Sequence, residues 1–115
     1  MRNKVDHTEV VNLDDPSLVV TAEITLQPGA AFPWHTHNGP VIVTVAEGEL
    51  TYVEPDCVER VYGAGSLFID TGRGVHTALN TFNGETVLIA TFLNVGPTGP
   101  LTIPVTRTAC GISTP

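Results

Sequence analysis

Short runs of β-forming residues, interrupted at close intervals by Gly, Pro, Asn and Asp, fill most of this 115-residue chain. Turn-forming residues at such close intervals are typical of a β-sandwich or barrel, and no segment has a convincing helical pattern. We expect nine strands, over Leu18–Leu26, Phe32–His37, Val41–Ala46, Glu49–Val53, Val58–Tyr62, Ser66–Ile69, His76–Phe82, Thr86–Asn94 and Leu101–Val105. The sequence therefore predicts an all-β fold.

The breaks between these runs predict the connections. Gln27–Gly29 predicts a turn, and the breaks at Ala46–Glu49 and Asn83–Gly84 predict hairpin turns. The tail is rich in proline, which suits an edge strand or a loop that wraps the barrel. These tail prolines are Pro97, Pro100, Pro104 and Pro115.

Length and composition narrow the class of protein. A chain of 115 residues with 42% hydrophobic content predicts one globular domain over residues 1–115. The formal charge of -7 disfavours nucleic acid and anionic membranes as partners, and no apolar run is long enough to span a bilayer. Met1–His7 lacks the apolar segment of a signal peptide, although a chain whose leader had been removed would look the same.

Two histidines with one residue between them mark a candidate site. On an extended strand, successive side chains point to opposite faces, so His35 and His37 project together and Thr36 points away. Trp34 would point away too, and we expect it to pack in the core. A third histidine from another strand, His76, would complete a set of nitrogen ligands that leaves metal positions open, as reactive sites require. The alternative is a pair of half-solvated strand histidines.

The residues around these histidines resemble the two conserved motifs of the cupin family. The first motif has Gly, His-x-His, Glu and Gly, and Gly29, His35, His37, Val41 and Gly48 stand at these positions. The second has Gly, Pro-x-Gly, His and Asn, and its positions are held by Gly65, Thr71-Gly72-Arg73, His76 and Asn80. Thr71 and Arg73 depart from the motif, but Gly72 and Gly74 can still form its turn. The resemblance implies a cupin-type double-stranded jelly-roll β-barrel.

By the same resemblance, His35, His37 and His76 correspond to three of the family's metal ligands. Val41 stands where the family has its fourth ligand, a glutamate, so the resemblance implies a three-histidine site without an acidic ligand. It also implies one divalent transition metal (Fe, Zn, Ni, Cu or Mn), a small-molecule ligand or substrate, and a homodimer. His7 is not counted as a ligand.

The resemblance leaves several functions open. Cupins that have lost this glutamate include thiol dioxygenases and a β-diketone dioxygenase, which implies a mononuclear metal-dependent oxygenase acting on a small organic molecule. The alternatives are a non-redox metal-dependent isomerase, lyase or cyclase, and a non-catalytic module that binds a small molecule or a metal. No general base accompanies the histidines in the sequence, which disfavours hydrolysis.

Several other side chains near the motifs could have structural or functional roles. Asn80 is either a turn residue or a group that orients His76, and Tyr52 or Tyr62 could donate a hydrogen bond inside the barrel. We expect Arg73 to be exposed. The aromatic residues expected in the core are Phe68, Phe82 and Phe92.

The two cysteines also allow two interpretations. Cys57 lies in a polar loop and Cys110 in the tail, and their spacing does not match a zinc site. They are either unrelated surface thiols of a cytoplasmic protein or a disulfide. Small cupins with cysteines in similar places resemble this chain, which implies a bridge that pins the tail to the barrel and export to the periplasm or the extracellular space.

Overall fold

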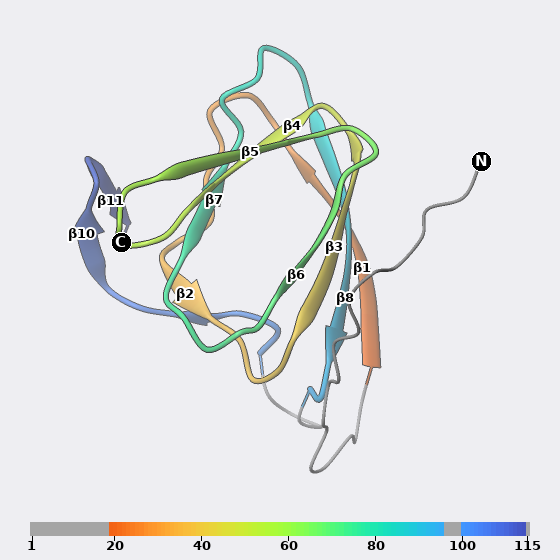
Figure 1. The fold of residues 1–115 in the computed structure, drawn as a ribbon, viewed down its shortest axis with the longest axis vertical. Coiled ribbons are helices and arrows are strands. Elements are labelled where there is room, and N and C mark those ends of the chain that lie inside the picture. The colour runs from red at the N-terminus through yellow and green to blue at the C-terminus, as the bar shows by residue number, and fades with distance from the viewer. Residues whose placement is uncertain (1–18, 96–99, 115) are drawn as a thin grey trace, which may run out of the picture.

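The computed structural model describes residues 19–95 and 100–114, and Figure 1 shows their arrangement. Regular structure in these ranges is entirely β, so none of it is a helix long and apolar enough to cross a membrane. The strands are β1 (Val19–Leu26), β2 (His35–Thr36), β3 (Val41–Glu47), β4 (Glu49–Val53), β5 (Glu59–Gly63), β6 (Leu67–Asp70), β7 (Thr77–Leu79), β8 (Thr86–Leu93), β9 (Ile103–Pro104), β10 (Arg107–Ala109) and β11 (Ile112–Thr114).

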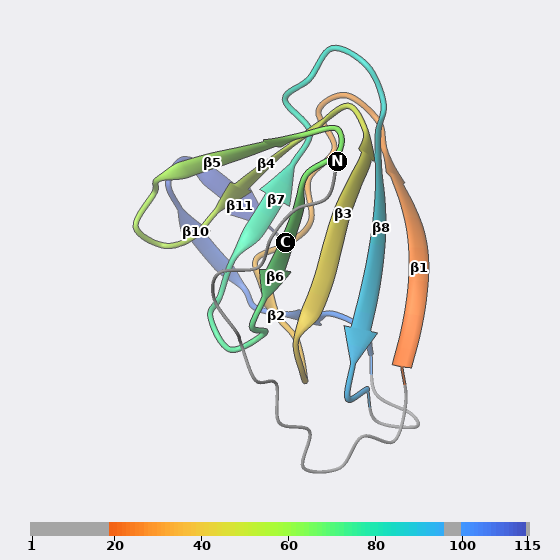
Figure 2. The same cartoon turned by 45° about the vertical axis from the view of Figure 1, so that its right-hand side comes forward.

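Two antiparallel sheets enclose the interior. A four-stranded sheet has the order β1-β8-β3-β6, and a three-stranded sheet has the order β5-β4-β7. Two short pairs, β2-β9 and β10-β11, complete the structure. Figure 2 shows β3, β8 and β1 side by side on one flank of the molecule. This arrangement confirms the predicted jelly-roll fold class.

Side-chain alternation explains why the central strands lie where they do. Along β8, Thr86, Leu88, Ala90 and Phe92 are buried and the residues between them are partly exposed. β3 alternates in the same way, because antiparallel strands with one face on the core bury every second residue. The core between the sheets comprises Leu26, Val41, Val43, Val45, Leu50, Ala78, Leu88, Ala90, Phe92 and Val95.

Every predicted strand overlaps an observed one, but two predicted hairpins are wrong. β3 and β4 belong to different sheets, as do β7 and β8, so the Ala46–Glu49 and Asn83–Gly84 breaks are crossovers between sheets. Gly48 adopts a φ of 78° there, and a Cβ on it would lie 2.4 Å from the carbonyl oxygen of Glu85. Glycine is required at this crossing because of the positive φ and the close approach of that carbonyl. The glycine therefore indicates a change of chain direction, but it does not indicate which strands pair.

One predicted core aromatic and the predicted tail differ from the structure. Phe68 and Phe92 belong to the core or pack against it, but Phe82 is exposed, because it lies in the loop between β7 and β8. The tail forms the β10-β11 pair, where the sequence predicted only a loop or edge. The expectations for Met1–His7, Leu18, Pro97 and Pro115 fall outside the described residues.

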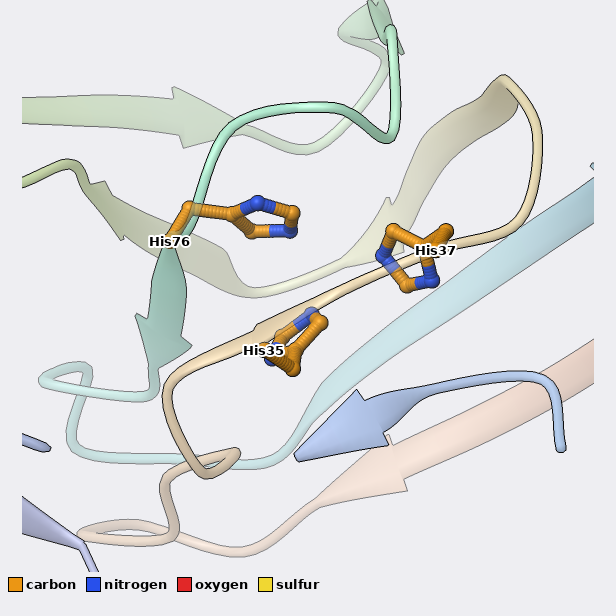
Figure 3. A group of neighbouring side chains, drawn as sticks. All are labelled: His35, His37 and His76. Carbon is orange, nitrogen blue, oxygen red and sulfur yellow. The ribbon is translucent and has the colours of Figure 1, made fainter. Parts of the chain in front are cut away.

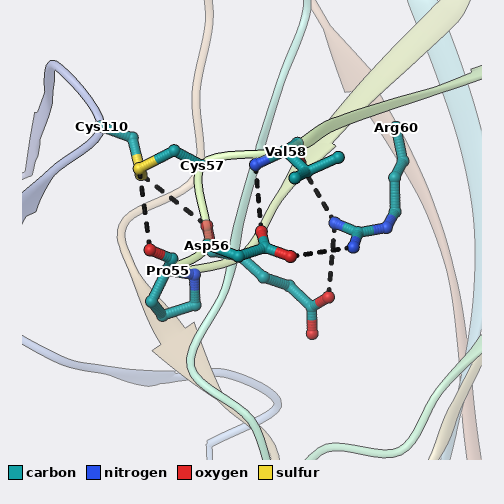
Figure 4. Close-up of a disulfide and its surroundings, with 7 residues drawn as sticks. Pro55, Asp56, Cys57, Val58, Arg60 and Cys110 are labelled. Carbon is teal, nitrogen blue, oxygen red and sulfur yellow. Dashed lines mark hydrogen bonds and ion pairs between the residues drawn. A yellow bond between two sulfur atoms is a disulfide. The ribbon is translucent and has the colours of Figure 1, made fainter.

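The turn between β10 and β11 lies against the loop between β4 and β5. Cys57 and Cys110 stand at disulfide distance, with their Cα atoms 5.2 Å apart (Figure 4). Arg60 braces the same loop through ion pairs to Asp56, at 3.0 Å, and to Glu54, at 3.4 Å. These exposed pairs contribute little to stability, so a covalent link would be the stronger tie between loop and tail.

Asn80 organises the loop between β7 and β8. Its buried side chain donates hydrogen bonds from Nδ2 to the carbonyl oxygens of Leu26, at 3.0 Å, and Gly84, at 2.9 Å. Its Oδ1 accepts a 2.8 Å hydrogen bond from the backbone N–H of Phe82. These bonds join the end of β1 to the loop before β8, and they favour the structural reading of Asn80 over one that orients His76.

Replacing Asn80 with Ala should therefore destabilise the fold. Two backbone carbonyls and one N–H would lose their side-chain partner, which should lower the free energy of unfolding by about 2 kcal/mol. Asn83→Ala, in the same loop but exposed, should stay within about 0.5 kcal/mol of wild type. Urea unfolding measures both, and equal midpoints for the two variants would contradict this role for Asn80.

Candidate metal centre

The three predicted histidines meet at the junction of β2 and β7. The backbones of His35 and His76 exchange two hydrogen bonds, of 2.9 and 3.0 Å, in an isolated antiparallel bridge. The N–H of His37 donates to the carbonyl of Gly72, at 3.0 Å. Gly72 has a φ of 85°, and a Cβ there would lie 2.4 Å from the Gly39 carbonyl oxygen. The prediction that this glycine forms the motif's turn is thus correct.

The imidazoles of the three residues form one cluster, shown in Figure 3. One ring nitrogen from each lies within 4.8 Å of those of the others. The centroid of the His35 ring is 4.8 Å from that of His37 and 4.3 Å from that of His76. Thr36 and Trp34 take no part in the cluster, and Trp34 is fully buried, as the sequence predicted.

Each imidazole is oriented by a backbone carbonyl. Nδ1 of His35 lies against the carbonyl of Pro33, Nδ1 of His37 lies 2.8 Å from that of Leu101, and Nδ1 of His76 lies 2.9 Å from that of Gly74. A carbonyl oxygen only accepts, so each Nδ1 carries the hydrogen and donates it. In the neutral ring Nε2 then holds a lone pair, the state in which histidine binds a metal.

A carboxylate that sequence reasoning missed lies against two of the three histidines. Oδ2 of Asp70 lies 2.7 Å from Nε2 of His76 and 3.2 Å from Nε2 of His37. Its Oδ1 accepts a 2.8 Å hydrogen bond from the N–H of Gly72. The site has the three predicted histidines and lacks the family's glutamate, as predicted for Val41, but a carboxylate from β6 lies beside two of the histidines.

Burial and this carboxylate act in opposite directions on the histidines. Burial, with the nearby histidines, lowers the pKa of His35 to about 4, so this ring is neutral at physiological pH. Burial is also the largest single influence on His37 and disfavours its charge, but the contact and charge of Asp70 together with the carbonyl of Leu101 outweigh burial and raise the pKa. Burial of Asp70 opposes ionisation, yet the bonds to His37 and His76 hold the pKa of its carboxyl well below the usual range. At physiological pH the cluster therefore combines an ionised carboxylate with a neutral imidazole.

A largely apolar cavity of about 60 Å³ opens onto the cluster. Beyond the cluster its walls include Ile24, Phe32, Val41, Val43, Leu50, Tyr52, Phe68, Leu88, Phe92 and Thr102. The Tyr52 ring stacks on His76, with centroids 5.0 Å apart, and burial together with the charge of Asp70 raises the pKa of its hydroxyl. Tyr62 stacks on Phe68 instead, and Arg73 is exposed, as expected.

The donor set fits a transition metal ion. Neutral imidazoles and a carboxylate are ligands that Fe, Zn, Ni, Cu and Mn accept, and the nitrogens are already held in the metal-binding tautomer. Because the ring nitrogens come from a rigid junction of strands, a bound ion would require little reorganisation. The open side of the cluster faces the cavity, where a small molecule could reach it.

Comparison with solved structures places this geometry among known folds. The polyketide cyclase RemF from Streptomyces resistomycificus superposes with a TM-score of 0.65 at 19% identity, over 81% of this chain and 64% of that one. A cupin-like protein from Thermotoga maritima gives 0.63 at 27% identity, over 69% and 61%. Oxalate oxidase gives 0.61 at 27% identity, over 76% and 46%. The chain thus spans less than two thirds of the length of each.

The sequence comparisons reach the same family. No curated protein sequence matches the chain significantly. The family described as "Cupin domain" matches residues 22–92, a range that runs from β1 to β8 and contains all three histidines. This match covers more than half of the 115 residues. The chain belongs to the cupin family.

Proposed function

We propose that His35, His37 and His76 bind one divalent transition metal ion, and that the protein is a metal-dependent oxygenase acting on a small organic molecule. The observation that carries this proposal is the common orientation of the three imidazoles, each with Nδ1 on a backbone carbonyl. Carbonyls hold the rings with Nε2 available, at the wall of an apolar cavity. A cluster of histidines used only for packing would not need the same tautomer three times.

The cavity supports a small, largely apolar substrate. Its volume of about 60 Å³ has room for about four water molecules. Apolar walls such as Phe32, Val41 and Phe92 would exclude water from the substrate. Tyr52 stays protonated because its pKa is raised, so its hydroxyl can donate a hydrogen bond to a substrate oxygen. The proposed substrate thus has a hydrocarbon body and at least one oxygen.

The metal would supply the chemistry that these residues cannot. Bound iron would supply activation of molecular oxygen, and bound zinc would instead act as a Lewis acid. Oxalate oxidase, 27% identical over 76% of this chain, is by its name an oxidase, which supports a redox reaction.

We also propose that residues 1–115 form one domain and that two copies associate through β1, an edge strand of the four-stranded sheet.

Replacing any one of the three histidines with Gln should remove the metal. Wild type dialysed against a divalent metal should retain about one ion per chain, and each variant less than about a tenth of that. Elemental analysis measures the ratio, and circular dichroism checks that the β fold is kept. His7→Gln is the matched control, because it makes the same chemical change at a histidine not counted as a ligand. Full metal content in all three cluster variants would place the site elsewhere.

Reconstitution separates the oxygenase from its alternatives. Metal-free protein is loaded in turn with Fe, Zn, Ni, Cu and Mn and given a panel of small ketones, thiols and carboxylates. Substrate-dependent consumption of oxygen with one redox-active metal supports the oxygenase. Turnover without oxygen consumption would instead indicate an isomerase, lyase or cyclase. Tight binding without any turnover would indicate a non-catalytic module.

We propose that the Cys57–Cys110 pair persists as a disulfide and that the protein works in an oxidising compartment after export. The two residues stand 53 apart in sequence and meet where the tail lies against the β4–β5 loop. Cytosolic thiols are normally kept reduced, so a stable structural bridge favours the periplasm or the extracellular space.

Removing the bridge should destabilise the protein. For a closed loop of this length, chain entropy predicts a loss of about 4 kcal/mol in the double variant Cys57→Ser/Cys110→Ser. Reductant should lower the unfolding midpoint of wild type towards that of the variant, and leave the variant unchanged. Mass spectrometry under non-reducing conditions gives the independent check. Two free thiols in protein secreted to an oxidising compartment would rule out both the bridge and the inference of export.

A further inference from the structure

Asp70 lies directly across the sheet from the position where cupins carry their glutamate. In the antiparallel pairing of β3 with β6, Val41 is the register partner of Asp70. Directly opposed residues of an antiparallel pair project to the same face, and both side chains line the cavity. A carboxylate on β6 therefore reaches the space that a longer side chain on β3 would otherwise fill.

The contacts of this carboxylate are unusual for a buried acid. Asp70 is 6% exposed, and the ion-pair partners of its side chain in the described ranges are His37 and His76. Arg60 forms its ion pairs with Glu54 and Asp56. Gly72 holds Oδ1 through its N–H, and this leaves Oδ2 aimed at the histidines. A buried carboxylate needs a positive partner or hydrogen bonds, and within the part of the chain that the structure describes the side chains paired with this one belong to the histidine cluster.

The groups that face Oδ2 of Asp70 indicate what kind of partner this oxygen requires. Since Nδ1 of His37 and of His76 donates to a carbonyl, Nε2 of each neutral ring presents a lone pair to Oδ2. Acceptors facing each other at 2.7 and 3.2 Å repel unless a cation lies between them. A proton on one nitrogen satisfies one of these contacts, whereas a metal ion satisfies both, and His35 as well.

The spacing also suits a common metal. Two ligand atoms about 2.1 Å from one ion are about 3.0 Å apart at a right angle and about 3.4 Å apart at the tetrahedral angle. The 3.2 Å distance from Oδ2 to Nε2 of His37 lies in this range, and the 2.7 Å distance to Nε2 of His76 is shorter than its lower limit. We propose that Asp70 is the fourth ligand of the metal bound by His35, His37 and His76, a carboxylate supplied by β6 in place of the one absent from β3.

This inference rests on the proposed metal site. An aspartate ligand would change the net charge of that site. Three neutral histidines would leave a divalent ion with its full charge, whereas an aspartate ligand lowers the net charge by one. The site would then hold its metal more tightly and attract anionic ligands less strongly than a three-histidine centre.

A pair of variants tests the assignment. Asp70→Asn keeps the shape of the side chain and the acceptor for Gly72 but removes the charge, and it should raise the Kd for Zn²⁺ or Co²⁺ at least tenfold. Adding Val41→Glu to Asp70→Asn returns a carboxylate from the facing strand, and should recover most of that affinity. Asp56→Asn is the matched control, because it removes one negative charge from an exposed position. Competition with a chelator gives the Kd, and the visible absorption of bound Co²⁺ reports any change in its ligands.

The outcomes separate this inference from the proposed function. If wild type and Asp56→Asn bind no metal, the proposed function itself fails. If wild type binds and Asp70→Asn matches it in Kd and Co²⁺ spectrum, Asp70 is no ligand and the three-histidine site stands.

An infrared difference spectrum of wild type avoids any dependence on how the variants fold. In protein labelled with ¹³C at the aspartate carboxyl carbon, metal binding should shift the stretching bands of one aspartate. An unshifted spectrum from metal-loaded protein would overturn the assignment.

Discussion

The backbone bridge between His35 and His76 is the contact on which the site depends. Its two hydrogen bonds join segments 41 positions apart, and they set the imidazoles of both residues on one wall of the interior. His37 then follows by strand alternation, and its own N–H is fixed by Gly72. Because the backbone sets these positions, the cluster does not require long or flexible side chains, and a bound ion would meet an arrangement already formed.

Asp70 and the histidines beside it shift one another's pKa values. Asp70 would be costly to bury alone, and the histidines beside it keep its pKa low and its carboxylate ionised. The same carboxylate raises the pKa of His37, while His35 stays neutral because burial dominates there. The apolar cavity strengthens these interactions by excluding water, so a change at Asp70 should reach every histidine of the cluster.

Local sequence pattern predicted the strands and the histidines well, because both depend on short-range rules. His35 and His37 share a face through the two-residue period of a strand, and the glycines at 29, 48, 65 and 72 adopt the positive φ values that turns require. Pairing between distant strands is not a local property. The glycine at 48 therefore marked a turn correctly, but no local pattern indicates that β3 and β4 separate into different sheets.

Asp70 was missed for a related reason. The strand Leu67–Asp70 alternates, but its aliphatic residues Leu67 and Ile69 face outward, at 60% and 49% exposed, while Phe68 and Asp70 face the cavity. Hydrophobicity alone favours the reverse orientation. Only the register of β6 against β3 reveals that Asp70 opposes Val41, and register is set by the whole sheet.

The most direct test of this account is anomalous diffraction from a crystal of the metal-loaded protein. The account predicts one anomalous peak per chain, about 2.0–2.2 Å from Nε2 of His35, His37 and His76 and from a carboxylate oxygen of Asp70. A peak bound to other residues, or a cluster without a peak while metal sits elsewhere, would contradict it.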